Sequence, residues 1–163
     1  RKDPTQAVFV LAAGRSGSTT TLFMLNQIPG FALRGENNGV LYKMLNSSLS
    51  QLVEGQQYLS TKPQVATAWF HADSMDMPSI LAGFKDLVIG FLNPPEQATT
   101  IGFKELVGRI FDYRRREMIG PAIMAQVFPG AKFILNYRYN ESSWLASEFW
   151  QQRDKEQYRK LVD

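Results

Sequence analysis

Short apolar runs alternate along the chain with longer stretches in which apolar residues recur every three or four positions. The short runs are bounded by glycine, proline or charged residues, so they predict strands; they lie at 7–12, 31–33, 99–105 and 132–138. Helical spacing predicts helices over 18–28, 40–52, 76–91, 110–127 and 141–161, with a polar loop over 54–64.

Strands that alternate with helices indicate an α/β fold with a parallel sheet. The 163 residues, 44% of them apolar, suffice for one domain over 1–163 with a substantial core. We therefore expect a three-layer domain in which helices flank a central parallel sheet. Ligands of such sheets bind at the carboxyl ends of the strands. The candidate residues that lie just past a predicted strand are Gly14, Arg15, Glu36, Lys104 and Arg138.

The first predicted strand runs into a glycine-rich turn and a helix start, AAGRSGSTTT. Free N–H groups and partial positive charge at a helix N-terminus attract anions. Gly14 and Gly17 allow the backbone to bend around an oxyanion, and Arg15 adds a permanently charged donor. Hydroxyl donors follow at Ser18, Thr19 and Thr20. The alternative is an ordinary capped turn, although this composition exceeds what capping requires.

Two common phosphate-binding patterns are missing from this turn. No lysine follows Gly17, so the Walker A pattern is absent, and the G-x-G-x-x-G pattern is absent as well. No apolar run ends in an aspartate suited to Mg²⁺. The turn therefore predicts a P-loop-like anion cradle that lacks the metal-binding parts.

The residues GRSGST after a strand resemble the 5′-phosphosulfate loop of sulfotransferases that use 3′-phosphoadenosine-5′-phosphosulfate (PAPS). The arginine form is similar to that of carbohydrate, tyrosylprotein and many bacterial members. The resemblance implies PAPS binding by Gly14, Arg15, Ser16, Gly17, Ser18 and Thr19. In several members a glutamate just after the next short strand acts as catalytic base, and Glu36 lies there.

A second motif, FPGAKFILNYR, ends in Arg138 and resembles the segment that binds the 3′-phosphate of PAPS in this family. The family places a serine about eight residues after the arginine. Here that position is Ala146, and Ser147 comes one later, so Ser147 is the expected ligand, with Ser142 and Ser143 as alternatives. A guanidinium and a hydroxyl together can distinguish PAPS from nucleotides without the 3′-phosphate.

Sulfonyl transfer requires positioning, charge stabilisation on the leaving oxygen and a base for the acceptor proton. Arg15 and the helix start are expected to stabilise charge on the leaving oxygen, and Glu36 is the candidate for the base. The alternative for Glu36 is that it is an exposed carboxylate in a turn. The strand of Lys104 looks like the one that supplies a sulfonate-contacting lysine in relatives. The alternative for Lys104 is a salt bridge with a nearby carboxylate. His71 is the next candidate for the base.

Composition limits the kinds of ligand, metal site and cellular compartment that fit this chain. A net charge of +3 favours anionic ligands without indicating nucleic acid. The chain has no cysteine and one histidine, which excludes disulfides and argues against cysteine or multi-histidine metal sites. No signal-peptide pattern or membrane-length apolar run is present, and both the Golgi lumen and the cytoplasm remain open.

The two motifs together predict a PAPS-dependent sulfotransferase without a metal. Its acceptor would be a hydroxyl or amine on a glycan, a small molecule or a protein side chain. The glycine-rich C-terminal PAPS-binding segment of cytosolic members is absent, so we expect a compact member or a fragment. The alternatives are another P-loop-type phosphotransferase or nucleotide hydrolase, and a PAPS- or nucleotide-binding module without catalysis.

Overall fold

The structure, a computed structural model, describes residues 4, 6–61, 74–110 and 119–139. The strands and helices in chain order are β1 (Gln6–Ala12), α1 (Ser18–Leu25), β2 (Phe31–Arg34), α2 (Val40–Thr61), α3 (Met77–Leu92), β3 (Thr100–Leu106), α4 (Val107–Ile110), α5 (Ile119–Val127) and β4 (Lys132–Asn136). The predicted helix at 141–161, together with His71 and Ser147, lies outside the described residues.

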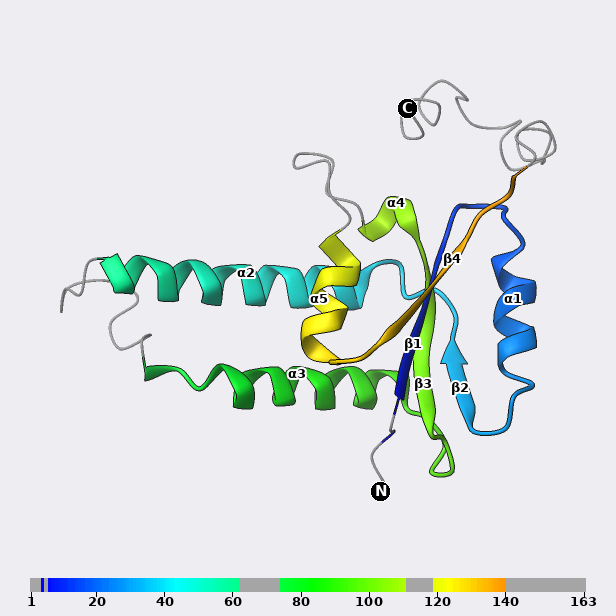
Figure 1. The fold of residues 1–163 in the computed structure, drawn as a ribbon, viewed down its shortest axis with the longest axis horizontal. Coiled ribbons are helices and arrows are strands. Elements are labelled where there is room, and N and C mark those ends of the chain that lie inside the picture. The colour runs from blue at the N-terminus through cyan, green and yellow to red at the C-terminus, as the bar shows by residue number, and fades with distance from the viewer. Residues whose placement is uncertain (1–3, 5, 62–73, 111–118, 140–163) are drawn as a thin grey trace.

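The four strands form one parallel sheet in the order β2-β3-β1-β4. Within it, Val10 of β1 pairs with Lys104 of β3 on one side and Ile134 of β4 on the other. Helix α1 covers one face of the sheet, whereas α2, α3 and α5 cover the other (Figure 1). The predicted α/β architecture, a central parallel sheet with helices on both faces, is confirmed.

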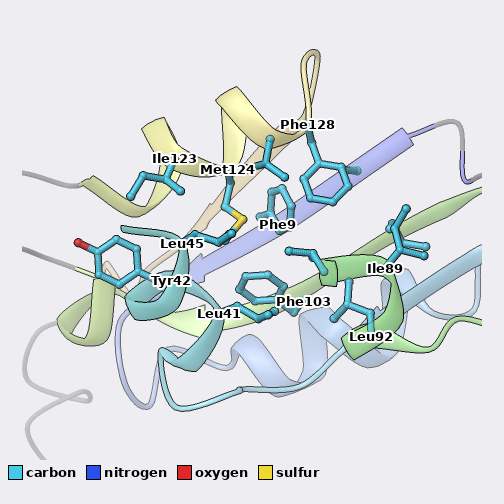
Figure 2. Close-up of a cluster of buried hydrophobic side chains, with 14 of the residues drawn as sticks. Phe9, Leu41, Tyr42, Leu45, Ile89, Leu92, Phe103, Ile123, Met124 and Phe128 are labelled. Carbon is cyan, nitrogen blue, oxygen red and sulfur yellow. The ribbon is translucent and has the colours of Figure 1, made fainter. Parts of the chain in front are cut away.

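Successive side chains of β1 point to opposite faces of the sheet, as in any strand. Phe9 belongs to the larger core under α2, α3 and α5, whereas Val8 packs with Leu22 and Leu33 under α1. The Phe9 ring is 1% exposed and its centroid lies 5.1 Å from that of Phe103 (Figure 2). Two buried faces explain why β1 reads as a continuous apolar run.

Several predicted boundaries are wrong, for identifiable reasons. Helix α1 ends at Leu25, with Asn26 as its C-cap, and the Asn26 side chain bonds both the N–H and the carbonyl of Leu33, which ties the helix end to β2. Helix α2 runs on to Thr61, so the predicted loop over 54–64 is wrong for 54–61. The loop is predicted because 54–64 is polar and contains Gly55 and Pro63, but Gly55 is buried in α2, and a helix tolerates glycine at a cost of about 1 kcal/mol.

The ends of β3 and β4 also differ from expectation. Strand β3 continues to Leu106, and β4 stops at Asn136 rather than at 138. The Asn136 carbonyl accepts the N–H of Ala13, where β1 gives way to the glycine-rich turn. Beyond this point β1 offers β4 no further partner, so the pairing ends. The segment predicted as a helix over 110–127 contains α5 and shares only Ile110 with α4, and the residues 111–118 between the two helices lie outside the described part.

Candidate functional site at the carboxyl edge of the sheet

The carboxyl ends of the four parallel strands meet at one edge of the sheet. The chain leaves β1 for β2, beyond β3, and leaves β3 for β4, beyond β1. The neighbours β1 and β3 therefore send their connections in opposite directions, which creates the crevice where open α/β sheets bind ligands. The turn over 13–17 and the end of β3 border this crevice.

The turn after β1 has the backbone conformation of an anion cradle. Arg15 and Gly17 have φ values of 62° and 83°, and Gly17 caps α1 without any side-chain hydrogen bond to the helix end. Within the described part of the chain, the N–H groups of Ser18 and Thr19 have no acceptor. The Arg15 side chain is exposed, and the space where a Gly17 Cβ would lie is open. These features suit an oxyanion.

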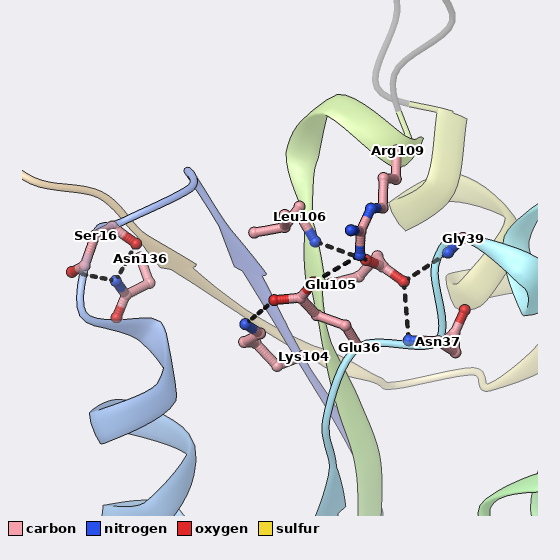
Figure 3. A network of polar contacts seen from close by, with 9 residues as sticks. All are labelled: Ser16, Glu36, Asn37, Gly39, Lys104, Glu105, Leu106, Arg109 and Asn136. Carbon is pink, nitrogen blue, oxygen red and sulfur yellow. Dashed lines mark hydrogen bonds and ion pairs between the residues drawn. The ribbon is translucent and has the colours of Figure 1, made fainter. Parts of the chain in front are cut away.

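Asn136, at the end of β4, fixes the turn to the sheet. Its Nδ2 donates to the Ser16 carbonyl at 3.0 Å and to Ser16 Oγ at 2.8 Å (Figure 3). Its Oδ1 accepts from Thr21 Oγ1 at 2.6 Å. One amide therefore holds both the turn and the first turn of α1 in position.

On the β3 side, the Glu36 carboxylate lies between two cations. Lys104 Nζ donates to Glu36 Oε1, and Arg109 Nη1 lies 2.6 Å from Oε2 (Figure 3). Partial burial on its own would raise the pKa of Glu36. The hydrogen bonds and charges of Lys104 and Arg109 outweigh burial, so the pKa lies below its ordinary value of 4.5. Glu36 is therefore ionised at neutral pH but is weakened as a base.

Lys104 is buried within β3 rather than exposed beyond it. Its side chain is 6% exposed, whereas that of Glu36 is 31% exposed. A buried ammonium needs a partner, and Glu36 supplies it. Lys104 thus forms the salt bridge that the sequence allowed as an alternative, and its partner is Glu36, the candidate for the base.

The predicted site residues that the structure describes gather at this one edge. The residues of the turn and helix start are Gly14, Arg15, Ser16, Gly17, Ser18 and Thr19, and Glu36 and Lys104 are in contact with each other. Arg138 lies two residues beyond β4 and is exposed. Ser147 lies outside the described residues, so the 3′-phosphate half is described only through Arg138.

Three polar residues of the edge were missed from the sequence: Glu105, Arg109 and Asn136. Glu105 and Arg109 are four residues apart, a spacing that can suggest an ion pair, although Glu105 lies on β3 and Arg109 on α4 rather than on one helix. The sequence carries no comparable signal for Asn136, because its partners Ser16 and Thr21 are 120 and 115 positions away.

Other features of the described residues lie elsewhere or are absent. A hollow of about 400 Å³ lies at the opposite, amino end of the sheet, lined by residues such as Gln6, Lys85 and Gly130. In the described ranges, no group of three or more His, Asp or Glu side chains is placed to hold a metal ion. No helix there has the length and apolarity required to cross a bilayer.

Comparison with known proteins adds no family assignment. No protein-family model matches the sequence, and a search of curated proteins gives no match.

Proposed function

We propose that this protein is a PAPS-dependent sulfotransferase. The observation that carries the proposal is the placement, at the carboxyl ends of the neighbouring strands β1 and β3, of a glycine-bent anion cradle and of an ionised carboxylate paired to a buried lysine. An anion cradle alone would suit many phosphate ligands. The adjacent carboxylate and lysine add the base and the cation that sulfonyl transfer requires.

The turn suits the 5′-phosphosulfate group. The N–H groups of Ser18 and Thr19, which have no acceptor among the described residues, can donate to its oxygens, as can the exposed guanidinium of Arg15. Asn136 keeps the turn in place without adding charge. Preorganised donors of this kind stabilise the negative charge that develops on a leaving oxygen.

PAPS would supply the sulfonyl group, and adenosine 3′,5′-bisphosphate would leave as the acceptor oxygen or nitrogen bonds to sulfur. Glu36 would take the acceptor's proton. Each carboxylate oxygen has two lone pairs, so the ion pairs with Lys104 and Arg109 leave room for a further hydrogen bond. Lys104 would keep Glu36 ionised, and Arg138 with Ser147 would hold the 3′-phosphate.

A non-catalytic nucleotide-binding module is the second candidate. It is favoured by the lowered pKa of Glu36, because a carboxylate paired with two cations is a weaker base. On this alternative, the pair between Glu36 and Lys104 would only stabilise the crevice wall.

Incubation with sulfur-labelled PAPS and a panel of glycans, phenols, lipids and peptides tests the proposal. The proposal predicts transfer of label to at least one acceptor without added metal. Tight binding of adenosine 3′,5′-bisphosphate with no transfer to any acceptor would favour the binding module. Mg²⁺-dependent turnover of ATP would favour a phosphotransferase or hydrolase instead.

A further inference from the structure

The carboxylate of Glu105 joins the end of β3 to the segment that follows Glu36. Its side chain is 1% exposed. Oε2 accepts the N–H of Gly39 at 2.8 Å and that of Asn37 at 3.3 Å, and Oε1 accepts the N–H of Leu106 at 2.9 Å (Figure 3). A buried carboxylate is tolerated only with such donors, so these bonds form a specific and rigid connection.

The segment over 37–39 depends on this connection. Asn38 and Gly39 have φ values of 59° and 70°, and asparagine adopts such values at some cost. A Cβ at Gly39 would lie 3.1 Å from the Arg109 carbonyl, so the segment packs closely against the chain that follows β3. The backbone next to Glu36 is therefore fixed from β3 as well as by the bonds that Asn37 makes to the N–H groups of Val40 and Leu41.

Arg109 provides a second link between Glu105 and Glu36. Its Nη1 lies 3.3 Å from Glu105 Oε1 and 2.6 Å from Glu36 Oε2. One nitrogen of the planar guanidinium, Nη1, therefore donates to both carboxylates and links the buried Glu105 to Glu36.

We propose that Glu105 is a positioning residue that holds the Glu36 carboxylate at the β1–β3 crevice, through the amides of Asn37 and Gly39 and through Arg109. This inference rests on the proposed role of Glu36 as the base. Glu105 itself is buried and touches no reactant. A displacement of about 1 Å in a reacting group can cost on the order of 10²-fold in rate.

The geometric half of the proposal is tested without any acceptor. Amide hydrogen exchange is compared between Glu105→Gln and Glu96→Gln, a matched change at an exposed loop carboxylate. Exchange at Asn37 and Gly39 is expected to accelerate about tenfold or more in Glu105→Gln and to stay unchanged in Glu96→Gln. Unchanged exchange at both amides in Glu105→Gln would overturn the proposal.

The catalytic half is tested by a double-mutant cycle with sulfur-labelled PAPS and the best acceptor of the panel. Glu105→Gln is expected to slow single-turnover transfer about 10- to 100-fold, with the affinity for adenosine 3′,5′-bisphosphate changed less than about twofold. In a Glu36→Gln background, the same change is expected to have no further effect. Additive effects would overturn the proposal, because Glu105 would then act independently of Glu36.

The two possible failures are distinguishable. If the wild-type protein transfers no label to any acceptor, the proposed function fails, while the exchange experiment still decides whether Glu105 fixes the segment.

If Glu105→Gln does not fold, Arg109→Met is the second variant, because it leaves the three amide bonds of Glu105 in place. Slower transfer in Arg109→Met, with Gly39 exchange unchanged, supports the link through Arg109. Unchanged transfer overturns it.

Discussion

Lys104 of β3 donates a hydrogen bond to the carboxylate of Glu36, a residue 68 positions earlier in the chain. The lysine is almost completely buried, while the glutamate remains partly open to solvent. Loss of the glutamate's charge would leave a buried ammonium without its counter-ion, which is strongly unfavourable. Glu36→Gln keeps an oxygen that can accept from Lys104 but loses the counter-ion, so this variant is expected to be less stable than the wild type at neutral pH.

Replacement of Lys104 by Met is expected to raise the pKa of Glu36 toward or above its ordinary value. Burial, which raises this pKa, would then be opposed by Arg109 alone. The titration of the Glu36 side-chain carbon by NMR measures the change directly. A Glu36 pKa that stays as low in Lys104→Met as in the wild type would contradict the role given to this ion pair.

The same pKa shift predicts a pH dependence of stability. Because the folded-state pKa of Glu36 is lowered, its contribution to the free energy of unfolding is present above pH 4.5 and is lost as the pH falls through the folded-state pKa. Urea unfolding of the wild type and Glu36→Gln across this range measures the contribution. We expect the difference between them to shrink as the pH falls below 4.5. A constant difference would argue against the shift.

Arg15→Ala is expected to weaken binding of adenosine 3′,5′-bisphosphate about tenfold, because a hydrogen bond to a charged group contributes roughly 1.5–3 kcal/mol. The side chain is exposed, so stability should change by less than about 0.5 kcal/mol. The matched control is Lys132→Ala, which removes one exposed positive charge at the opposite edge of the sheet. If both variants bind the bisphosphate equally well in calorimetry, Arg15 is not a ligand.

Asn136→Ala should lower both stability and affinity. The side chain makes hydrogen bonds to Ser16 and Thr21, and the loss of two or three such bonds costs about 1–3 kcal/mol. Asn26→Ala is the control, since it also removes two bonds but at Leu33, away from the turn. We expect similar losses in urea unfolding and a weaker affinity for the bisphosphate in Asn136→Ala alone. Equal affinities would show that the turn does not need this amide.

A preference for adenosine 3′,5′-bisphosphate over AMP tests the role of Arg138. Contacts from Arg138 and a serine hydroxyl should favour the bisphosphate at least tenfold, given roughly 1.5–3 kcal/mol for each charged hydrogen bond. Arg138→Ala should remove most of that preference while leaving AMP affinity unchanged. Equal wild-type affinity for the two nucleotides in calorimetry would remove the argument for a 3′-phosphate site.

The anion cradle after β1 could be predicted from the sequence because the signals for it are local. An apolar run predicts a strand buried on both faces, two glycines predict the bend, and the strand-helix alternation predicts that later strands lie parallel to it. These signals do not depend on distant partners. They placed β1, the turn with Arg15 and the start of α1 correctly.

The opposite wall of the crevice could not be predicted in the same way. Lysine and glutamate are rarely fully buried, so the sequence alone offers no reason to expect Lys104 and Glu105 to be buried near the end of a strand. Their burial depends on partners from other elements, Glu36 for Lys104 and the amides around Gly39 for Glu105. The pairing of β3 beside β1 brings these groups together, and no local pattern encodes it.

The central claim is that Glu36 accepts a proton during sulfonyl transfer at this edge. Its most direct test is single-turnover transfer from sulfur-labelled PAPS by the wild type and by Glu36→Gln, with a titration of adenosine 3′,5′-bisphosphate for both proteins. The proposed function predicts a rate about 10²–10⁴-fold lower in Glu36→Gln, with nearly equal nucleotide affinity. Equal transfer rates in the two proteins would contradict it.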